Sequence, residues 1–116
     1  MARHAWVDLQ GTIIHHDEDR AVPLMPEFVS AMQRQGWNVR VVTRFQVAAA
    51  EARLHNAGIE LDVPIISTND RGAAALALLQ EEPEIETLMI IDNKPENLRR
   101  IHEMALLLPR VHLPAR

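Results

Sequence analysis

The sequence predicts a three-layer α/β fold built on a central, mostly parallel sheet. Short apolar runs alternate along the chain with longer stretches of helical periodicity, and this alternation is typical of parallel strands joined by right-handed helical crossovers. The runs show little polar alternation, as expected of strands that are covered on both faces. A length of 116 residues, without a repeat or a linker, predicts one domain over residues 1–116.

Five short apolar runs predict the strands of this sheet. They cover residues 5–7, 39–42, 63–66, 88–91 and 110–113. The run at 63–66 is the weakest of the first four, because Pro64 suits the start or the edge of a strand. The sequence therefore predicts a five-stranded sheet whose last strand is short.

Four stretches predict the helices. They cover residues 26–35, residues 46–57, residue 70 to the residue before Pro83, and residue 95 to the residue before Pro109. Gly36 and Gly58 end the first two, and Asp70 is a natural N-cap for the third. The side chains predicted to face the core from the first two helices are Phe28, Val29, Met32, Val47, Ala50 and Leu54.

Composition excludes several classes of function. The chain has 12 basic and 16 acidic residues, so its charge does not indicate nucleic-acid binding. It has no cysteine, which excludes disulfides and thiolate metal sites. No apolar run is long enough to cross a bilayer, and the first residues do not resemble a signal peptide. We therefore expect a cytoplasmic protein without a membrane partner.

Three polar side chains follow predicted strands at the point where each strand ends. They are Asp8, Thr43 and Asp92. Ligands of open α/β sheets bind beyond the carboxyl ends of the strands. We therefore expect these two acids and one hydroxyl to share one rim of the sheet and to form a functional site.

The same positions carry a family resemblance. Residues 8–12, Asp-Leu-Gln-Gly-Thr, directly follow the first strand and resemble the Asp-x-Asp-Gly-Thr signature of the haloacid dehalogenase (HAD) superfamily. Thr43, Arg71 and the segment 88–98 (LMIIDNKPENL) are similar, in that order, to the later motifs of the family. The matches extend from residue 5 to about residue 98. The resemblance implies a Rossmann-like domain, here without a cap domain because the chain has no room for one.

The resemblance also implies a chemistry and a set of site residues. Asp8 would attack phosphorus and form an aspartyl-phosphate. Asp8, Asp92 and the backbone carbonyl of Gln10 would hold Mg²⁺, a hard cation that prefers oxygen ligands. The residues expected to bind the phosphoryl group are Gly11, through backbone N–H groups that approach the phosphate, Thr43, Arg71 and Lys94 as an alternative cation.

Gln10 departs from the family pattern. HAD phosphatases carry a second aspartate there, which protonates the leaving group, whereas a glutamine amide does not titrate. Three interpretations stay open: the leaving group needs no acid, Gln10 orients a water molecule, or the domain binds without turnover. His15 or His16, in the polar segment that follows, could replace the missing acid.

The function predicted from the sequence is a Mg²⁺-dependent phosphohydrolase with an open site, in which Asp8, Gln10, Thr43 and Arg71 take part in catalysis. Its substrate would be a phosphorylated compound or macromolecule, and a neighbouring subunit could cover the site. The alternative is a catalytically impaired binding or scaffold domain. A receiver domain is disfavoured, because the paired acids that such domains carry after the first strand are missing.

Overall fold

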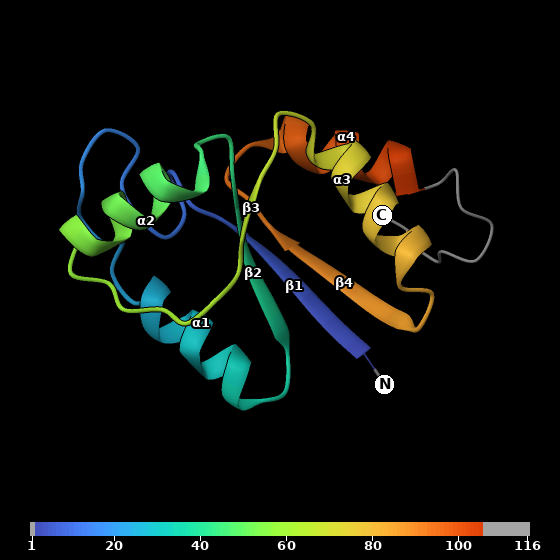
Figure 1. The fold of residues 1–116 in the computed structure, drawn as a ribbon, viewed down its shortest axis with the longest axis horizontal. Helices are drawn as coiled ribbons and strands as arrows, with labels where there is room; N and C mark the ends of the chain where they lie inside the picture. Colours follow the sequence, from blue (N-terminus) through green and yellow to red (C-terminus); the bar gives the residue numbers. More distant parts are fainter. Residues whose placement is uncertain (1, 106–116) are drawn as a thin grey trace.

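Alternating strands and helices make up the fold, as the sequence predicts. The computed structural model describes residues 2–105. The elements are β1 (Ala2–Asp8), α1 (Met25–Arg34), β2 (Asn38–Thr43), α2 (Val47–Asn56), β3 (Ile65–Ser67), α3 (Arg71–Glu81), β4 (Ile85–Ile91) and α4 (Pro95–Ala105) (Figure 1). Within the described residues, no helix is both long enough and apolar enough to cross a membrane.

The strands form one parallel sheet. Their order is β3-β2-β1-β4, and each of the three neighbouring pairs is parallel. The described residues thus contribute four strands instead of the five predicted. The predicted fifth strand, at residues 110–113, lies outside the described residues. The third strand begins after Pro64, because proline cannot donate to the ladder of hydrogen bonds.

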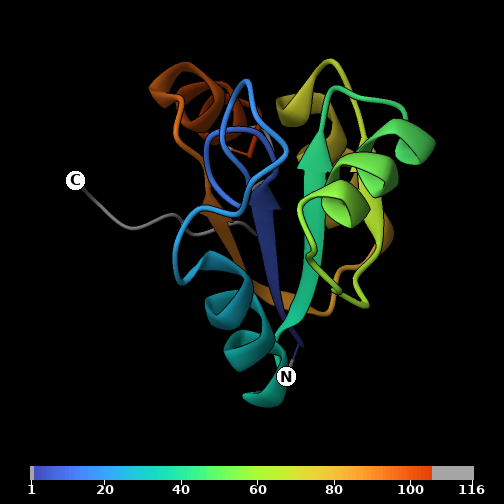
Figure 2. The same ribbon diagram turned by 90° about the vertical axis from the view of Figure 1, so that its left-hand side faces the viewer.

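Helices cover both faces of the sheet. In Figures 1 and 2, α1 and α2 lie on one side of the strands and α3 and α4 on the other. One apolar cluster joins β1 and β2 to the first two helices through side chains such as Val29 and Leu54. A second cluster joins Trp6 on β1 to Leu79 on α3 and Ile101 on α4. The three layers therefore enclose two cores, one on each side of the sheet.

Two side chains predicted to be buried are exposed, which corrects the predicted helix faces. Phe28 is 44% exposed and Val47 is 41% exposed. The first helix packs through Val29 and Met32, three residues apart, so Phe28 lies at the margin of that stripe. Val47 is the first residue of α2, which buries Ala50 and Leu54 further along the helix.

A buried histidine lies on β1. His4 is only 5% exposed, and its Nδ1 atom has no hydrogen-bond partner. Burial lowers the pKa of His4, and the positive charge of Arg40 on β2 lowers it further, while Glu82 and Glu84 oppose the shift. His4 therefore stays neutral in the folded chain at pH values at which an unfolded histidine binds a proton.

This histidine should make the chain less stable in mild acid. Below about pH 6.5 the unfolded chain binds a proton at residue 4 that the folded chain does not, so stability falls as the pH is lowered further. We expect His4→Leu to reduce this loss in urea unfolding curves recorded between pH 7.5 and pH 5 (roughly the range that such a shift covers). The same substitution at the exposed His55 is the matched control. Parallel stability profiles for wild type and His4→Leu would contradict the assignment.

Candidate functional site

Asp8 and Asp92 lie at the point where the order of the strands reverses. The chain passes from β1 to β2 and β3 on one side and then returns to place β4 on the other side of β1. The two strands pair in register up to Val7 and Ile91, so the next residue of each is an aspartate. Ligands of open α/β sheets bind outside the strand ends at such a switch point. The topology therefore places both acids where a ligand site is expected.

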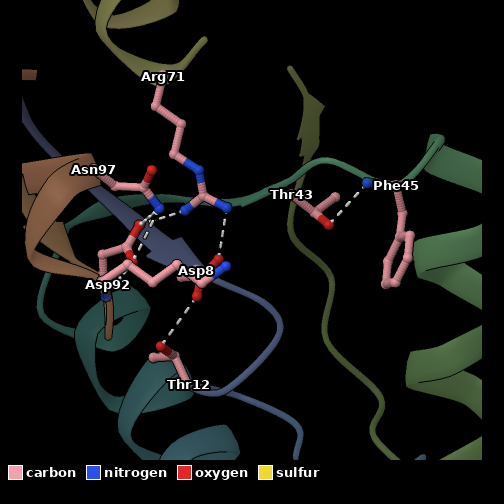
Figure 3. A network of polar contacts seen from close by, with 8 residues as sticks. Asp8, Thr12, Thr43, Phe45, Arg71, Asp92 and Asn97 are labelled. Atoms are coloured by element: carbon pink, nitrogen blue, oxygen red, sulfur yellow. Dashed lines mark hydrogen bonds and ion pairs between the residues drawn. The ribbon is translucent and has the colours of Figure 1, made fainter. Parts of the chain in front are cut away.

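Arg71 connects these two carboxylates (Figure 3). It is the first residue of α3, and its side chain extends across the strand ends. Its Nη2 atom donates to Oδ1 of Asp8 at 2.7 Å, and its Nη1 atom donates to Oδ2 of Asp92. The side chains of Arg71, Asp8 and Asp92 are 10%, 4% and 1% exposed, respectively. The three groups thus form a buried ionic cluster with two negative charges and one positive charge.

Burial dominates the electrostatics of Asp8. Desolvation raises the pKa of Asp8, and the hydrogen bond and charge of Arg71 lower it without cancelling that effect. The negative charge of Asp92 also raises this pKa, and the hydroxyl of Thr12, which donates to Oδ2 of Asp8 at 3.4 Å, lowers it. Arg71 is therefore the main group that favours the ionised form of Asp8.

Two donors besides Arg71 orient Asp92. The backbone N–H of Lys94 donates to its Oδ1 atom at 2.9 Å, and the amide of Asn97 donates to its Oδ2 atom at 3.2 Å. Asn97 lies in the first turn of α4. Neither Asn97 nor Thr12 was among the site residues predicted from the sequence. The spacing in the sequence could have indicated Asn97. This residue follows Asp92 by five residues and lies in the first turn of α4, so its side chain can reach the aspartate at the end of β4.

The start of α3 is fixed in two ways, which positions Arg71. The carboxylate of Asp70 accepts the backbone N–H of Ala73 at 3.1 Å, so the predicted N-cap is confirmed. It also pairs with Arg100 of α4 at 3.2 Å. Gly72 lets α3 approach α4 closely, since a Cβ atom at this residue would lie 2.9 Å from the backbone oxygen of Arg100. Close contact between α3 and α4 therefore brings Arg71 to Asp92.

Gly72→Ala should weaken this contact between the helices. The added methyl group would also lie 2.8 Å from side-chain atoms of Arg100 and Met104, so the helices must move apart. We expect the free energy of unfolding to fall by about 1–3 kcal/mol, the usual effect of overpacking. Denaturant unfolding measures this change, with Ala77→Ser on the exposed side of α3 as the control. Equal midpoints for Gly72→Ala and wild type would show that α3 and α4 tolerate a wider separation.

Gly11 allows the loop after β1 to pass close to the loop after β4. Its φ angle is +79°, a backbone conformation that favours glycine. A Cβ atom at this residue would clash with the side-chain amide of Asn93. The sequence analysis expected free backbone N–H groups here, but the N–H of Gly11 itself donates to the carbonyl of Ile14 at 2.7 Å. This bond closes the loop, so Gly11 shapes the site in this structure instead of presenting its own N–H to a ligand.

Gln10 and Thr43 lie at the site but use their polar groups within the protein. The amide of Gln10 donates to the backbone carbonyl of His16 at 3.2 Å. The hydroxyl oxygen of Thr43, at the end of β2, accepts the backbone N–H of Phe45 at 3.1 Å (Figure 3). A hydroxyl can also donate, but Thr43 is only 1% exposed, so a ligand would have to reach its proton from the sheet edge.

The remaining predicted site residues do not join this ionic cluster. The ammonium group of Lys94 forms no ion pair with another described residue, although the backbone N–H of Lys94 binds Asp92. His16 lies 3.9 Å from the exposed carboxylate of Asp17. The Nε2 atom of His15 is buried and has no partner among the described residues. The structure therefore assigns neither histidine to the ionic cluster.

The donor set at the strand ends fits a hard divalent cation. Asp8 and Asp92 converge on one cationic group, the guanidinium of Arg71. Among residues 2–105, no group of three acidic, histidine or cysteine side chains forms a metal site. Two carboxylates are nevertheless the usual protein contribution at Mg²⁺ sites, where water and substrate oxygens complete the coordination. The side chains thus suit a metal ion that shares its coordination sphere with a ligand.

Comparisons with known proteins identify the fold and no family. No family model matches the sequence. No curated protein matches it either. The fold is similar to the crystal structure of a hypothetical protein from Xanthomonas campestris, with a TM-score of 0.60 and 19% sequence identity. The match covers 85% of this chain and 58% of the other protein, so the chain spans less than two thirds of that neighbour. At this identity, the likeness supports the α/β fold alone.

Proposed function

We propose that the chain is a Mg²⁺-dependent phosphohydrolase of the HAD type, with Asp8 as its nucleophile. The observation that carries the proposal is the convergence of Asp8 and Asp92 on one cation at the switch point of a parallel sheet. The motif resemblance identified Asp8, Asp92 and Arg71 from the sequence, without knowledge of where they lie in the fold. The shared location of all three supports a site in which a carboxylate meets an anionic substrate.

The proposed reaction has two displacements at phosphorus. In the first, a carboxylate oxygen of Asp8 attacks phosphorus, the bond from phosphorus to the leaving oxygen breaks, and the aspartyl-phosphate forms. In the second, water attacks the same phosphorus, the bond from phosphorus to the Asp8 oxygen breaks, inorganic phosphate leaves with the protons of the water, and the carboxylate of Asp8 is regenerated. The burial of Asp8 limits its hydration, which favours attack on a bound phosphoryl group.

Several side chains would stabilise the phosphoryl oxygens. Arg71 has a buried Nε–H group without a partner among the described residues, and this donor suits a phosphoryl oxygen. The hydroxyl proton of Thr43 supplies a second donor. Mg²⁺ held by Asp8, Asp92 and the carbonyl of Gln10 would supply Lewis-acid neutralisation of the repulsion between carboxylate and phosphate.

Gln10 restricts the class of substrate. Its amide cannot protonate a leaving group, and it donates to the carbonyl of His16. We therefore propose substrates whose leaving oxygen is stable as an anion, such as aryl phosphates, acyl phosphates and phosphoanhydrides. Such leaving groups depart without general-acid help.

Hydrolysis of an activated aryl phosphate tests the proposal. Wild type should release the phenolate in the presence of Mg²⁺, lose this activity with a chelator, and regain it when Mg²⁺ is restored. Brief incubation followed by an acid quench should leave a phosphoryl group on the peptide that contains Asp8, which mass spectrometry detects. Asp62→Asn changes an exposed aspartate outside the site and is the control. Absence of turnover with every activated phosphate would sink the hydrolase proposal.

A second candidate function is a noncatalytic domain that binds a metal ion and a phosphorylated partner. The observation that favours it is the use of the Gln10 amide in a structural hydrogen bond to His16, which leaves no titrating group at this position. It predicts that inorganic phosphate binds in the presence of Mg²⁺, as measured by calorimetry, while no aryl phosphate is hydrolysed. Turnover by wild type would exclude this candidate.

A further inference from the structure

Arg71 occupies the space between the two carboxylates to which the proposed metal ion would bind. Each terminal nitrogen of its guanidinium contacts one aspartate, and the contacts use Oδ1 of Asp8 and Oδ2 of Asp92. The other oxygen of Asp8 accepts from Thr12, and the other oxygen of Asp92 accepts from the backbone of Lys94, while Oδ2 of Asp92 accepts from Asn97 as well as from Arg71. The oxygens that contact Arg71 are therefore the two that face a common cation.

We propose that Arg71 and the divalent metal ion are alternative occupants of this cation site. One occupant is the guanidinium, which contacts both Asp8 and Asp92 in this structure. Binding of the metal ion displaces the two terminal nitrogens, which then become donors to a phosphoryl group. This inference rests on the metal site of the proposed function and adds an exchange in which Arg71 changes partners.

Geometry and charge both oppose simultaneous binding. Mg²⁺ requires oxygen ligands at about 2.0–2.1 Å in nearly octahedral positions, and the N–H groups of Arg71 already point at the oxygens that it would need. Two cations side by side also repel each other in a buried site. The carboxylates can satisfy the guanidinium or the metal ion, so the binding of one weakens the binding of the other.

The exchange would convert the cluster into an anion site. The charges of Asp8, Asp92 and Arg71 add to −1 (two carboxylates and one guanidinium), which disfavours a phosphate dianion. A divalent metal ion changes this sum to +1 and releases a guanidinium whose Nε–H group is already buried without a partner. Metal and phosphate should therefore favour each other's binding, as linkage requires.

Calorimetric titration with Mg²⁺, without substrate, tests the exchange. Arg71→Met removes the competing cation and retains much of the apolar side chain, so it should bind Mg²⁺ roughly 5- to 150-fold more tightly than wild type, the usual range of coupling between sites. Mg²⁺ should also raise the thermal midpoint of this variant more than that of wild type. Arg40→Met removes another partly buried, ion-paired arginine, which contacts Glu82 away from the strand ends, and should bind Mg²⁺ as wild type does. Equal or weaker binding by Arg71→Met would overturn the exchange.

A second measurement uses wild type alone and does not depend on the folding of a variant. With ¹⁵N-labelled arginine, the Nε resonance of Arg71 should shift as Mg²⁺ is added, while that of Arg40, which pairs with Glu82, stays fixed. Binding of Mg²⁺ without a shift of the Arg71 resonance would overturn the exchange and leave the proposed hydrolase intact. Exchange without aryl phosphate hydrolysis would instead support the inference and contradict the hydrolase. Failure of Mg²⁺ to bind would remove the metal site and the exchange together.

Discussion

Asp8→Asn is expected to lower Mg²⁺-dependent hydrolysis of an aryl phosphate by on the order of 10³-fold or more, to the rate without protein. Asparagine has the shape of aspartate, but its amide oxygen is a poor nucleophile toward phosphorus. The substitution also removes one of the two carboxylates that converge on Arg71. The initial rate of phenolate release at saturating Mg²⁺ measures the loss.

The loss should not result from unfolding. Burial raises the pKa of Asp8, so its charge is costly to the fold, and Arg71 keeps its second partner, Asp92, in the variant. We expect a change in unfolding free energy of no more than about 1–3 kcal/mol, the cost of one altered buried hydrogen bond. Far-ultraviolet circular dichroism should match that of wild type. A fully folded variant that retains the wild-type rate would exclude Asp8 as the nucleophile.

The rim of the sheet could be predicted from the sequence because of a topological rule. Apolar runs that end on Asp8, Thr43 and Asp92 predict parallel strands with polar groups at the carboxyl ends, and the structure confirms these strands as parallel. The N-cap at Asp70 follows equally directly from local chemistry. The N-cap is a local feature, whereas the rim follows from the general rule that the carboxyl ends of parallel strands lie at one edge of the sheet.

The hydrogen-bond partner of each polar side chain at the site could not be predicted in this way. The amide of Gln10 contacts the carbonyl of His16 because the segment after β1 folds back over it. That path depends on Arg53 of α2, which donates to the carbonyl of His15 and to the carboxylate of Asp19. Contacts between segments almost forty residues apart are tertiary, and no periodicity encodes them.

Helix faces illustrate the same limit. Periodicity identifies the apolar stripe of a helix. How many side chains of that stripe are buried depends on the area of the sheet that the helix covers. Phe28 and Val47 lie at the margins of their stripes and stay exposed, whereas Val29 and Ala50 are fully buried. The bridge from Arg71 to both aspartates was likewise beyond sequence reasoning, since it requires α3 and α4 to touch.

Gln10→Asp is expected to raise turnover of a phosphate ester with a poor leaving group, such as an alkyl phosphate, by about 10²–10⁴-fold. The introduced carboxyl group can donate a proton to the departing oxygen and then accept one from the attacking water, which the amide cannot do. The gain should be much smaller for an activated aryl phosphate, whose leaving oxygen needs no proton. The ratio of the two rates in each protein, measured as kcat/KM, separates acid catalysis from a general effect on the site.

Gln10→Asp also removes a hydrogen bond that holds the loop, so a control variant is needed. An ionised aspartate cannot donate to the carbonyl of His16, so the hydrogen bond between residue 10 and His16 is lost. Gln10→Asn is the matched control, because it shortens the side chain equally and introduces no acid. If Gln10→Asp and Gln10→Asn have the same kcat/KM ratio for the two substrates, residue 10 does not reach the leaving group. The amide of Gln10 then serves to hold the loop, and a proton donor must come from elsewhere or is not needed.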